Sequence, residues 1–334
     1  MYDLMVIGGG PAGSSAAIVT ARQGASVLLL ERGKLPRHKV CGEFVSPESL
    51  ALLNTLLVAE HTELLQSSGT ISQARLFLEG EVAASVIDPP AASIARFDLD
   101  LALWDSAERS GVRTLQQSAV LKILGSGPFR VETSSGEFEA RAVVNASGRW
   151  SNLNQHRNES PGPKWLGIKA HFAERDAPNS VDLYFFEGGY CGIQPVLLRD
   201  NGKEGRINVC AMVRADIATS LGQVFDCHAD LGSRSESWKL LSEPVSTSPL
   251  VFREPEPVQD HVLLAGDAAA FVDPFVGDGI SLALRSGSLA AECLEQCLRG
   301  KESLFEAANR YRLEYERRFT PVFRASARIR GKPA

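Results

Sequence analysis

The stretch from Asp3 to Gly13 reads DLMVIGGGPAG. Its residues 4–7 form a short apolar run, typical of a strand buried in a parallel sheet. Three glycines and Pro11 follow, and small residues then recur at helical spacing as far as Gln23. Gly24 stands where a helix commonly ends. The pattern predicts a strand, a tight turn and a helix.

A second apolar run at residues 25–30, ASVLLL, predicts another buried strand. Strand, helix and strand make a βαβ unit with a right-handed crossover. The first turn fits the pattern G-x-G-x-x-G with Gly8, Gly10 and Gly13. In such turns the first glycine permits the bend, the second lets a pyrophosphate approach the backbone, and the third lets the helix pack on the strand.

The helix that starts at Pro11 and Ala12 would direct its N-terminal amides and positive dipole end at that pyrophosphate. Glu31 lies 23 residues after Gly8, a spacing at which a carboxylate binds ribose hydroxyls. The strand, the helix and Glu31 together favour a dinucleotide site over a glycine-rich turn without a ligand.

Composition sets broad limits on the protein. The chain has 334 residues, enough for about two domains, and 44% of them are hydrophobic. The net charge of −5 provides no basic field for nucleic acid. Six scattered cysteines form no CxxC pair and the six histidines show no ligand spacing, so we expect no metal and a reducing, cytoplasmic location. We expect neither a signal peptide nor a transmembrane segment.

The remaining pattern predicts helices and strands in two groups. Helices are expected at residues 46–65, 98–110, 279–298 and 303–319, and strands at 73–87, 113–115, 120–124, 129–133, 137–140, 142–145, 181–187, 206–214 and 261–265. Asp88-Pro89-Pro90 should close the strand before it, because proline cannot donate to a sheet interior. Tyr311, Tyr315 and Phe319 form an apolar stripe, which usually packs on its own protein; a membrane or carrier-protein surface is the alternative.

A second constellation is HVLLAGDAAAFVDPFVGDGI at residues 261–280. The buried strand would deliver Gly266 and Asp267 to the carboxyl edge of the sheet, where a carboxylate could bind a polyol hydroxyl. Gly277 and Gly279 would open the N-terminus of the next helix toward the group beyond that polyol. FAD has a ribityl chain and NAD has none, so this constellation favours FAD. The alternative is that both glycines serve only a loop with positive φ.

The fingerprint with Glu31, Arg96-Phe97-Asp98 before a helix, and Gly266-Asp267 with Pro274, Gly277 and Gly279 together resemble the FAD-dependent superfamily of p-hydroxybenzoate hydroxylase, geranylgeranyl reductase and the flavin halogenases. The resemblance implies an α/β fold. It comprises a Rossmann-like (GR2-type) FAD-binding domain with a parallel sheet at residues 1–70, 91–160 and 253–300, an antiparallel-sheet substrate domain at 71–90 and 161–252, and C-terminal helices at 301–334.

The resemblance also assigns cofactor roles. It implies that Glu31 binds the adenosine ribose, Arg96 lies near the pyrophosphate and ribityl, Val120 packs near the adenine, and Asp267 holds a ribityl hydroxyl. Amides near Ile280 would stabilise the negative charge of the reduced flavin. The FAD-binding residues expected are Gly8, Gly10, Pro11, Ala12, Gly13, Glu31, Arg32, Cys41, Gly42, Arg96, Val120, Gly148, Asp267, Pro274, Gly277, Gly279 and Ile280.

Three catalytic candidates follow from the motifs, and no catalytic residue is assigned. Residues 39–47, KVCGEFVSP, resemble the Cys-Gly loop over the flavin ring of geranylgeranyl reductases, and residues 188–195, GGYCGIQP, resemble their aromatic-x-Pro strand motif. Cys41 could donate a proton or form an adduct, or could merely pack against the ring. Glu43 is a proton donor if desolvated and otherwise an exposed loop residue. Tyr190 is the third candidate; Tyr190 and Gly192 stand where halogenases carry tryptophans, which disfavours halogenation.

The source of electrons is open. Ser147 occupies the aspartate position of an Asp-Gly pair that contacts FAD and pyridine nucleotide in single-component hydroxylases, and serine cannot supply that charge. We hypothesise that a reductase partner or loosely docked NAD(P)H reduces the flavin.

Three functions follow from the resemblance. The first is a flavin monooxygenase that acts through a C4a-hydroperoxide on an aromatic or polyketide-like, apolar small molecule. The second is a geranylgeranyl reductase-like enzyme that delivers hydride from FAD N5 to an isoprenoid or other C=C bond. The third is a flavin-binding electron carrier without turnover. The sequence leans slightly toward the first.

Overall fold

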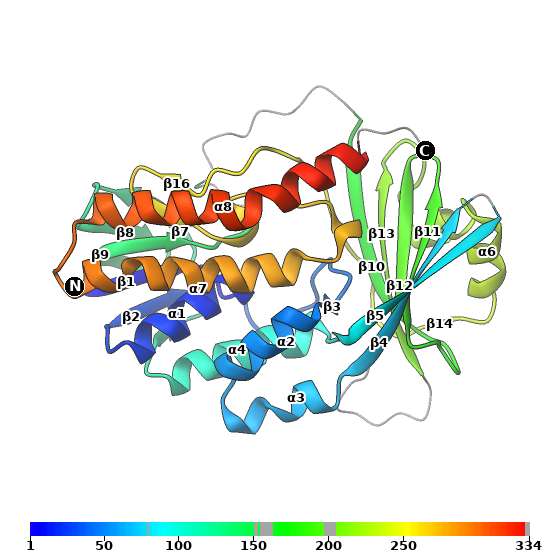
Figure 1. Cartoon of the computed structure of the whole chain (residues 1–334), viewed down its shortest axis with the longest axis horizontal. Coiled ribbons are helices and arrows are strands. Elements are labelled where there is room, and N and C mark those ends of the chain that lie inside the picture. Colours follow the sequence, from blue (N-terminus) through cyan, green and yellow to red (C-terminus); the bar gives the residue numbers. More distant parts are fainter. Residues whose placement is uncertain (79, 150–152, 154–162, 197–204, 331–334) are drawn as a thin grey trace.

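The computed structural model describes residues 1–78, 80–149, 153, 163–196 and 205–330. The described chain contains two sheets that stand side by side, with long helices along the first (Figure 1). We call them sheet A and sheet B. The segment 151–164 is rich in asparagine, proline and glycine, which predicts a crossing into a different sheet, and it lies mostly outside the described residues.

Sheet A has the order β16-β17-β9-β1-β2-β6, with β7 and β8 continuing from β9. Its core is parallel: β1 pairs with β2 and β9, β17 pairs with β9, and β6 pairs with β2. The strands are β1 Tyr2–Ile7, β2 Val27–Leu30, β6 Arg113–Leu115, β7 Val120–Leu124, β8 Phe129–Thr133, β9 Gly136–Asn145, β16 Val258–Gln259 and β17 Val262–Leu264.

The two faces of sheet A are covered differently. Leu4 and Val6 of β1 belong to a core with the helices, whereas Met5 and Ile7 pack with β7 and β8. Both faces are therefore buried, which explains the continuous apolar run of the first strand. The helices are α1 Pro11–Arg22, α2 Pro47–Leu56, α3 Glu63–Gln66, α4 Arg96–Arg109, α7 Gly279–Leu298 and α8 Leu304–Arg330, with the short 3₁₀ turns η1 Ala59–His61, η2 Gly266–Ala268 and η3 Pro274–Val276.

Sheet B has the order β14-β10-β13-β12-β11-β4-β5-β3, and β15 also pairs with β10. It is antiparallel except between β4 and β11. The strands are β3 Phe44–Val45, β4 Gly69–Leu78, β5 Glu81–Ser93, β10 Trp165–Ala173, β11 Ser180–Phe186, β12 Gly189–Pro195, β13 Arg206–Arg214, β14 Lys239–Leu240 and β15 Val245–Thr247. Along the chain, the strands of sheet B thus fall between groups of strands that belong to sheet A.

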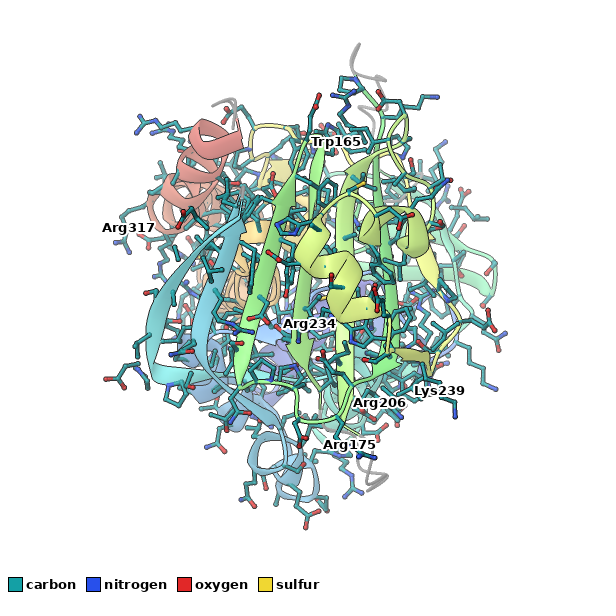
Figure 2. The ribbon with its side chains drawn as sticks, turned by 90° about the vertical axis from the view of Figure 1, so that its right-hand side faces the viewer. Trp165, Arg175, Arg206, Arg234, Lys239 and Arg317 are labelled. Atoms are coloured by element: carbon teal, nitrogen blue, oxygen red, sulfur yellow. The ribbon has the colours of Figure 1, made fainter. Side chains whose placement is uncertain are left out.

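Alternation divides sheet B into two faces. The outer face is apolar, and α5 (Leu221–Phe225) and α6 (Ala229–Ser235) lie over it (Figure 2). On β13, Ile207, Val209 and Val213 are buried on this side, as the alternation predicted. On β11 the alternation places Val181 and Leu183 on one face, and both line the cavity on the opposite side of the sheet. We call the side that carries them the inner face.

Two sequence predictions were wrong between residues 46 and 93. The expected helix at 46–65 is split into α2, η1 and α3. The expected strand 73–87 is a hairpin that turns at Gly80 (φ +85°), and β5 continues through Asp88-Pro89-Pro90 to Ser93. The prolines are tolerated because they fall in a register irregularity, between the pairs Gln73–Val86 and Ile71–Ala91, where no ladder hydrogen bond is needed.

Two other predictions need correction. The strands expected at 137–140 and 142–145 form one strand, β9. The last helix runs past Pro321 as far as Arg330, because Phe323 packs into the main core and Ser326 is buried. Its aromatic stripe packs on its own protein: Tyr311 is 0% exposed and donates a hydrogen bond to Leu264 O at 2.8 Å.

Candidate functional site

A cavity of about 810 Å³ lies between sheet A and the inner face of sheet B. This is within the size range of cofactor sites, at its large end. All the predicted cofactor residues line it except Gly13, and so do the three catalytic candidates Cys41, Glu43 and Tyr190. The two distant sequence constellations therefore meet in one cavity.

The glycine turn forms one end of this cavity. Gly8 has φ +106° and its peptide passes so close to Ala146 that an added Cβ would lie 2.3 Å from a carbonyl oxygen. Gly13 touches Gly8 in the same way, which explains why it does not line the cavity: it serves helix packing. At Gly10, by contrast, an added Cβ would meet only Arg96 and Lys39 side-chain nitrogens, each at 3.7 Å.

Two cations and one carboxylate stand beside Gly10. Arg96 holds Asp100 through two hydrogen bonds of 2.7 and 2.9 Å, and Lys39 Nζ lies 2.6 Å from the same carboxylate. The cations keep the pKa of Asp100 low although the group is fully buried. The cluster carries one excess positive charge next to the N-terminus of α1, which is where an anion is stabilised.

Glu31 lies beside the same turn and is 4% exposed. Its carboxylate accepts hydrogen bonds from Gly9 N at 2.9 Å, Gly33 N at 2.8 Å and Arg37 Nη2 at 2.9 Å. These contacts fix its orientation, and a carboxylate with about four acceptor sites has capacity left for a hydroxyl. Arg32, Val120 and Gly148 complete this side of the cavity wall.

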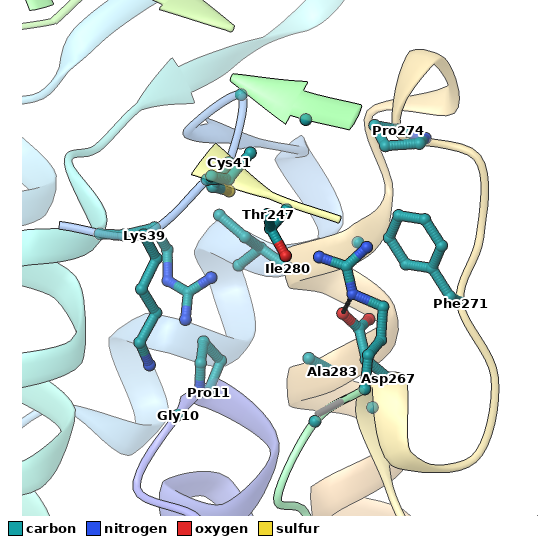
Figure 3. A pocket seen from close by; sticks show the side chains of 18 of the residues that line it. Gly10, Pro11, Lys39, Cys41, Thr247, Asp267, Phe271, Pro274, Ile280 and Ala283 are labelled. Atoms are coloured by element: carbon teal, nitrogen blue, oxygen red, sulfur yellow. Dashed lines mark ion pairs between the residues drawn. The ribbon is translucent and has the colours of Figure 1, made fainter. Parts of the chain in front are cut away.

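Asp267 lies farther along the cavity, where Arg149 faces it at 3.4 Å (Figure 3). Arg149 also stacks on Phe271, with its guanidinium carbon 4.0 Å from the ring centre. Burial raises the pKa of Asp267, and the Arg149 charge only partly offsets this. Asp267 keeps 38% of its side chain exposed, facing a cavity that it lines.

The turn before α7 brings further amides to the cavity. Gly277 adopts the left-handed conformation (φ +73°) and α7 starts at Gly279. The Asp278 side chain does not cap this helix, and Gly279 and Ile280 line the cavity. Unsatisfied N–H groups of a 20-residue helix thus lie at the cavity wall.

The segment Cys41–Gly42–Glu43, which we call the Cys-Gly loop, connects sheet A to β3 of sheet B. Asn208 Nδ2 donates to Cys41 O at 3.1 Å and to Gly42 O at 2.8 Å. Because a trans peptide directs its C=O and N–H to opposite sides, the Gly42 N–H points away from Asn208. A Cβ added to Gly42 would touch nothing within 4 Å, so the loop borders open cavity there.

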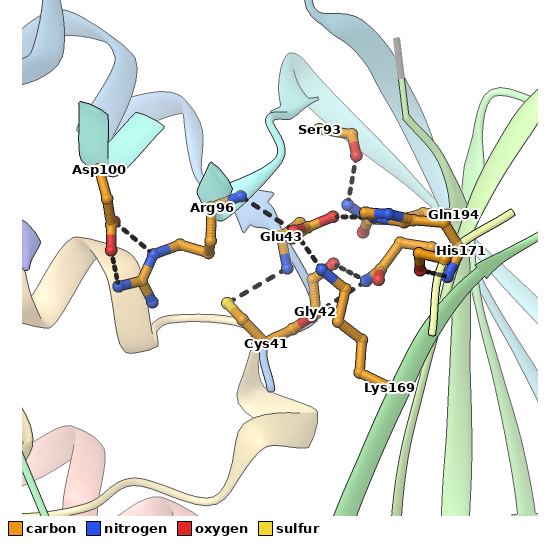
Figure 4. Close-up of polar contacts among 11 residues, drawn as sticks. Cys41, Gly42, Glu43, Ser93, Arg96, Asp100, Lys169, His171 and Gln194 are labelled. Carbon is orange, nitrogen blue, oxygen red and sulfur yellow. Dashed lines mark hydrogen bonds and ion pairs between the residues drawn. The ribbon is translucent and has the colours of Figure 1, made fainter. Parts of the chain in front are cut away.

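Glu43 is neither an exposed loop residue nor a free proton donor. Its side chain is 0% exposed, and its carboxylate contacts Lys169 Nζ at 2.5 Å, His171 Nε2 at 2.8 Å and Arg96 N at 2.9 Å (Figure 4). These partners hold its pKa below the ordinary value in spite of burial. Glu43 is therefore ionised at neutral pH.

Tyr190 belongs to the apolar part of the cavity wall. Burial raises its pKa well above the ordinary value, and its hydroxyl lies 3.3 Å from Asp273 Oδ1, so the phenol stays neutral. The apolar residues around it on the inner face and the adjoining loop are Val181, Leu183, Met212, Leu250, Phe271 and Phe275. Gln194, bonded to Ser93 Oγ at 2.6 Å, is a polar group at the other end of this wall.

Sequence reasoning missed Lys39, Arg149, Lys169, His171 and Asn208. Lys39 is the first residue of the motif at 39–47, which assigned it no role. Lys169 and His171 lie on β10, where residues 166–172, LGIKAHF, alternate apolar with small or polar side chains, so alternation could have placed both on one face. Their meeting with Glu43, 126 and 128 residues away, could not be predicted from it. Within the described ranges, no group of three or more His, Cys, Asp or Glu is arranged to hold a metal.

Comparison with protein families matches the first half of the chain to FAD-dependent oxidoreductases. Two family models, each described as FAD dependent oxidoreductase, match residues 3–42 and 40–171. The chain belongs to the FAD-dependent oxidoreductase family. It is accordingly an enzyme of the oxidoreductase class, as the sequence resemblance predicted.

Curated relatives include reductases and a halogenase. The chain is 30% identical to menaquinone reductase of Mycobacterium tuberculosis, over 88% of this chain and 76% of that protein. It is 26% identical to digeranylgeranylglycerophospholipid reductase 2 of Methanopyrus kandleri, over 97% of this chain and 84% of that one. It is also 27% identical to flavin-dependent halogenase armH3 of Armillaria mellea, over 95% and 72%.

Solved structures confirm the fold. The myxobacterial chondrochloren halogenase superposes with a TM-score of 0.80 at 24% identity, over 97% of this chain and 81% of that chain. Flavin-dependent brominase Bmp2 gives 0.78 at 21% identity, over 99% and 90%. No helix in the described part of the chain is both long and apolar enough to cross a membrane.

Proposed function

We propose that the cavity holds FAD along its length and an apolar substrate against the inner face of sheet B. Glu31 would hold the adenosine ribose, the Gly10 turn with Lys39 and Arg96 the pyrophosphate, and Asp267 the ribityl chain. The N-terminus of α7 would face the ring. On this proposal sheet A and its helices form the cofactor domain and sheet B the substrate domain. Sheet B extends beyond the predicted segment 71–90, because it also contains β3 and the outer ends of β4 and β5.

The surroundings of Gly10 support this assignment. Only a glycine leaves the space between its backbone and the Arg96 and Lys39 side chains open. The single excess positive charge of Lys39, Arg96 and Asp100, together with the α1 N-terminus, suits a pyrophosphate. FAD, when bound, supplies a two-electron redox centre that can exchange hydride with a substrate.

We propose further that the reaction is reduction of a C=C bond or quinone in an apolar molecule. The observation that carries this choice is the relationship to menaquinone reductase across 88% of this chain. The apolar wall from Val181 to Phe275 supports it, since it excludes water from the substrate face. The substrate would be neutral, because no cation from sheet B lines this wall within the described residues.

Oxygen transfer to an aromatic or polyketide-like molecule is the second candidate, favoured by the same dry wall. Halogenation is disfavoured by Tyr190 and Gly192 in the strand motif. A lysine that matches the halogenase lysine is also not found. Lys39 is the sole lysine on the described cavity wall, and Asp100 binds it.

The test is product mass. The purified protein should be yellow, and incubation with a quinone and a reduced electron donor should add two hydrogens to the product. An added oxygen atom would instead support the monooxygenase. Glu31→Ala should reduce the FAD retained through purification at least several-fold, and unchanged flavin content would contradict the site.

The electron source is a separate proposal. Ser147 is bonded to Asn145 Oδ1 through its N and Oγ at 3.1 and 2.6 Å, and carries no charge for a nicotinamide nucleotide. We therefore favour a reductase partner over NAD(P)H. Rapid bleaching of the flavoprotein by NADPH alone in a stopped-flow experiment would overturn this choice.

A further inference from the structure

The buried group Glu43, Lys169 and His171, which we call the inner cluster, joins the two halves of the molecule. Glu43 ends the Cys-Gly loop, whereas Lys169 and His171 project from the inner face of β10 (Figure 4). All three side chains are 0–1% exposed. Burying a charged pair costs solvation, so this cluster is poor evidence of a purely stabilising role.

The backbone of Glu43 adds a second observation. Glu43 has φ 62°, a backbone conformation that residues other than glycine, asparagine and aspartate seldom adopt. Such strain persists where surrounding contacts determine the conformation, and it concentrates at functional sites. Here the carboxylate contacts Lys169, His171 and Arg96 N, while Glu43 O accepts Ile94 N at 3.0 Å.

The neighbouring strand anchors the rest of the loop. Asn208 is the cross-strand partner of His171, and Cys210 is the partner of Lys169. Asn208 holds the carbonyls of Cys41 and Gly42, so the loop is bound to sheet B at three consecutive residues. The cavity side of the loop is left to Gly42 and Cys41, both of which line the cavity.

We propose that Glu43 is a positioning residue whose carboxylate, held by Lys169 and His171, couples the Cys-Gly loop to the substrate sheet. When a bound substrate displaces β10 or β13, the inner cluster and Asn208 thereby move Cys41 and Gly42 at the cofactor side of the cavity. This inference rests on the proposed function for its meaning in catalysis, but the coupling itself is a property of the chain.

The experiment compares Glu43→Gln, Lys169→Met and the double variant E43Q/K169M with wild type. The control is Glu174→Gln, which breaks a charge pair with Arg234 on the outer face of the same sheet. The first measurement is the rate at which iodoacetamide alkylates Cys41, followed by peptide mass spectrometry in protein stripped of FAD. The second is the visible spectrum of the flavin with FAD added back.

Each single inner-cluster variant should alkylate Cys41 at least about fivefold faster than wild type and shift the flavin absorption band. The double variant, which leaves no unpaired buried charge, should regain thermal stability, but Cys41 should stay as reactive as in the single variants because the contact that positions the loop is still missing. E174Q should match wild type in both measurements. Should the single variants lose stability while Cys41 reactivity and the spectrum stay at wild-type values, the inner cluster is structural and the proposal is overturned.

Failure of the proposed function gives a different pattern. If the wild-type protein takes up no FAD, the spectrum carries no information, yet the alkylation rates still decide whether Glu43 positions the loop. If E43Q does not fold, K169M and the double variant decide by the same readout.

Discussion

The inner cluster and the charged group on the outer face of sheet B show what burial of charge does in two settings. Arg234 lies on the outer face, which faces the viewer in Figure 2. It binds Asp182 together with Arg75, and it binds Glu174 through two hydrogen bonds of 2.7 Å. Both arginines keep partial solvent contact. In the inner cluster one carboxylate serves a lysine and a histidine without any such contact.

The difference lies in what each group connects. The outer group joins α6 to strands of the same sheet, and each carboxylate keeps a second partner if one contact is lost: Arg75 for Asp182 and Trp238 for Glu174. The inner cluster joins the Cys-Gly loop to β10, and among the described residues Lys169 is the lysine or arginine side chain that contacts the Glu43 carboxylate, with His171 and Arg96 N as its other partners. The inner cluster therefore joins two separate parts of the molecule, whereas the outer group joins elements of one sheet.

The largest expected effect is a loss of stability, and it tests the comparison between the inner cluster and the outer charged group directly. Lys169→Met should lower the free energy of unfolding by about 3–5 kcal/mol, because it leaves the buried Glu43 carboxylate without its cation. Arg234→Met should cost only about 1–3 kcal/mol, since Arg75 and Trp238 remain. Urea unfolding of both variants at saturating FAD gives these values. Equal losses would show that complete burial of the inner cluster does not make the loss of its cation more costly.

A smaller effect is expected at Asp267, whose carboxylate we propose to hold the ribityl chain of FAD. Its pKa is raised by burial, so the ionised form is unfavourable in the folded protein and Asp267→Asn should raise the melting temperature without FAD at pH 7.5. The same change should weaken FAD binding at least about tenfold, the value of one charge-assisted hydrogen bond. Calorimetry with and without FAD tests both signs, with the exposed Asp216→Asn as the control. A variant that loses stability without FAD would contradict the assignment.

The smallest expected effect is a pH dependence of stability that comes from His38, which lies beside the inner cluster. His38 packs against His171 with ring centres 5.4 Å apart, and its pKa is lowered by burial and by the charges of Lys169 and His171. The unfolded chain takes up the His38 proton near its ordinary pKa of about 6.5, so stability should fall as the pH drops below that value. His38→Gln should flatten this part of the curve. Melting temperatures measured from pH 7.5 to 5.5 test it, and parallel curves for variant and wild type would sink the idea.

Much of the cofactor half follows from local patterns in the amino-acid sequence. The buried run at residues 4–7, the glycines 8, 10 and 13 and the strand before Asp267 each predicted their element because local spacing and steric demand determine them. The aromatic stripe of α8 was likewise predicted to pack on its own protein, and it does. The site residues taken from the resemblance converge on one cavity.

Long-range contacts could not be predicted in this way. The sequence does not show that a proline pair falls in a register irregularity of β5, or that β10 brings Lys169 and His171 to a loop more than 120 residues earlier. Periodicity specifies which residues share a face, whereas the pairing of distant strands specifies which faces meet.

Local sequence was sufficient to specify a βαβ dinucleotide fold, the FAD resemblance and the carboxylates at Glu31 and Asp267, because close approach of backbone to a ligand restricts residue type locally. The folded arrangement was needed to establish that Glu43 is buried yet ionised, and that Tyr190 is buried beside Asp273. Those states depend on solvent exclusion and on charges supplied by strands far away in the chain, and neither is encoded in any single stretch of residues.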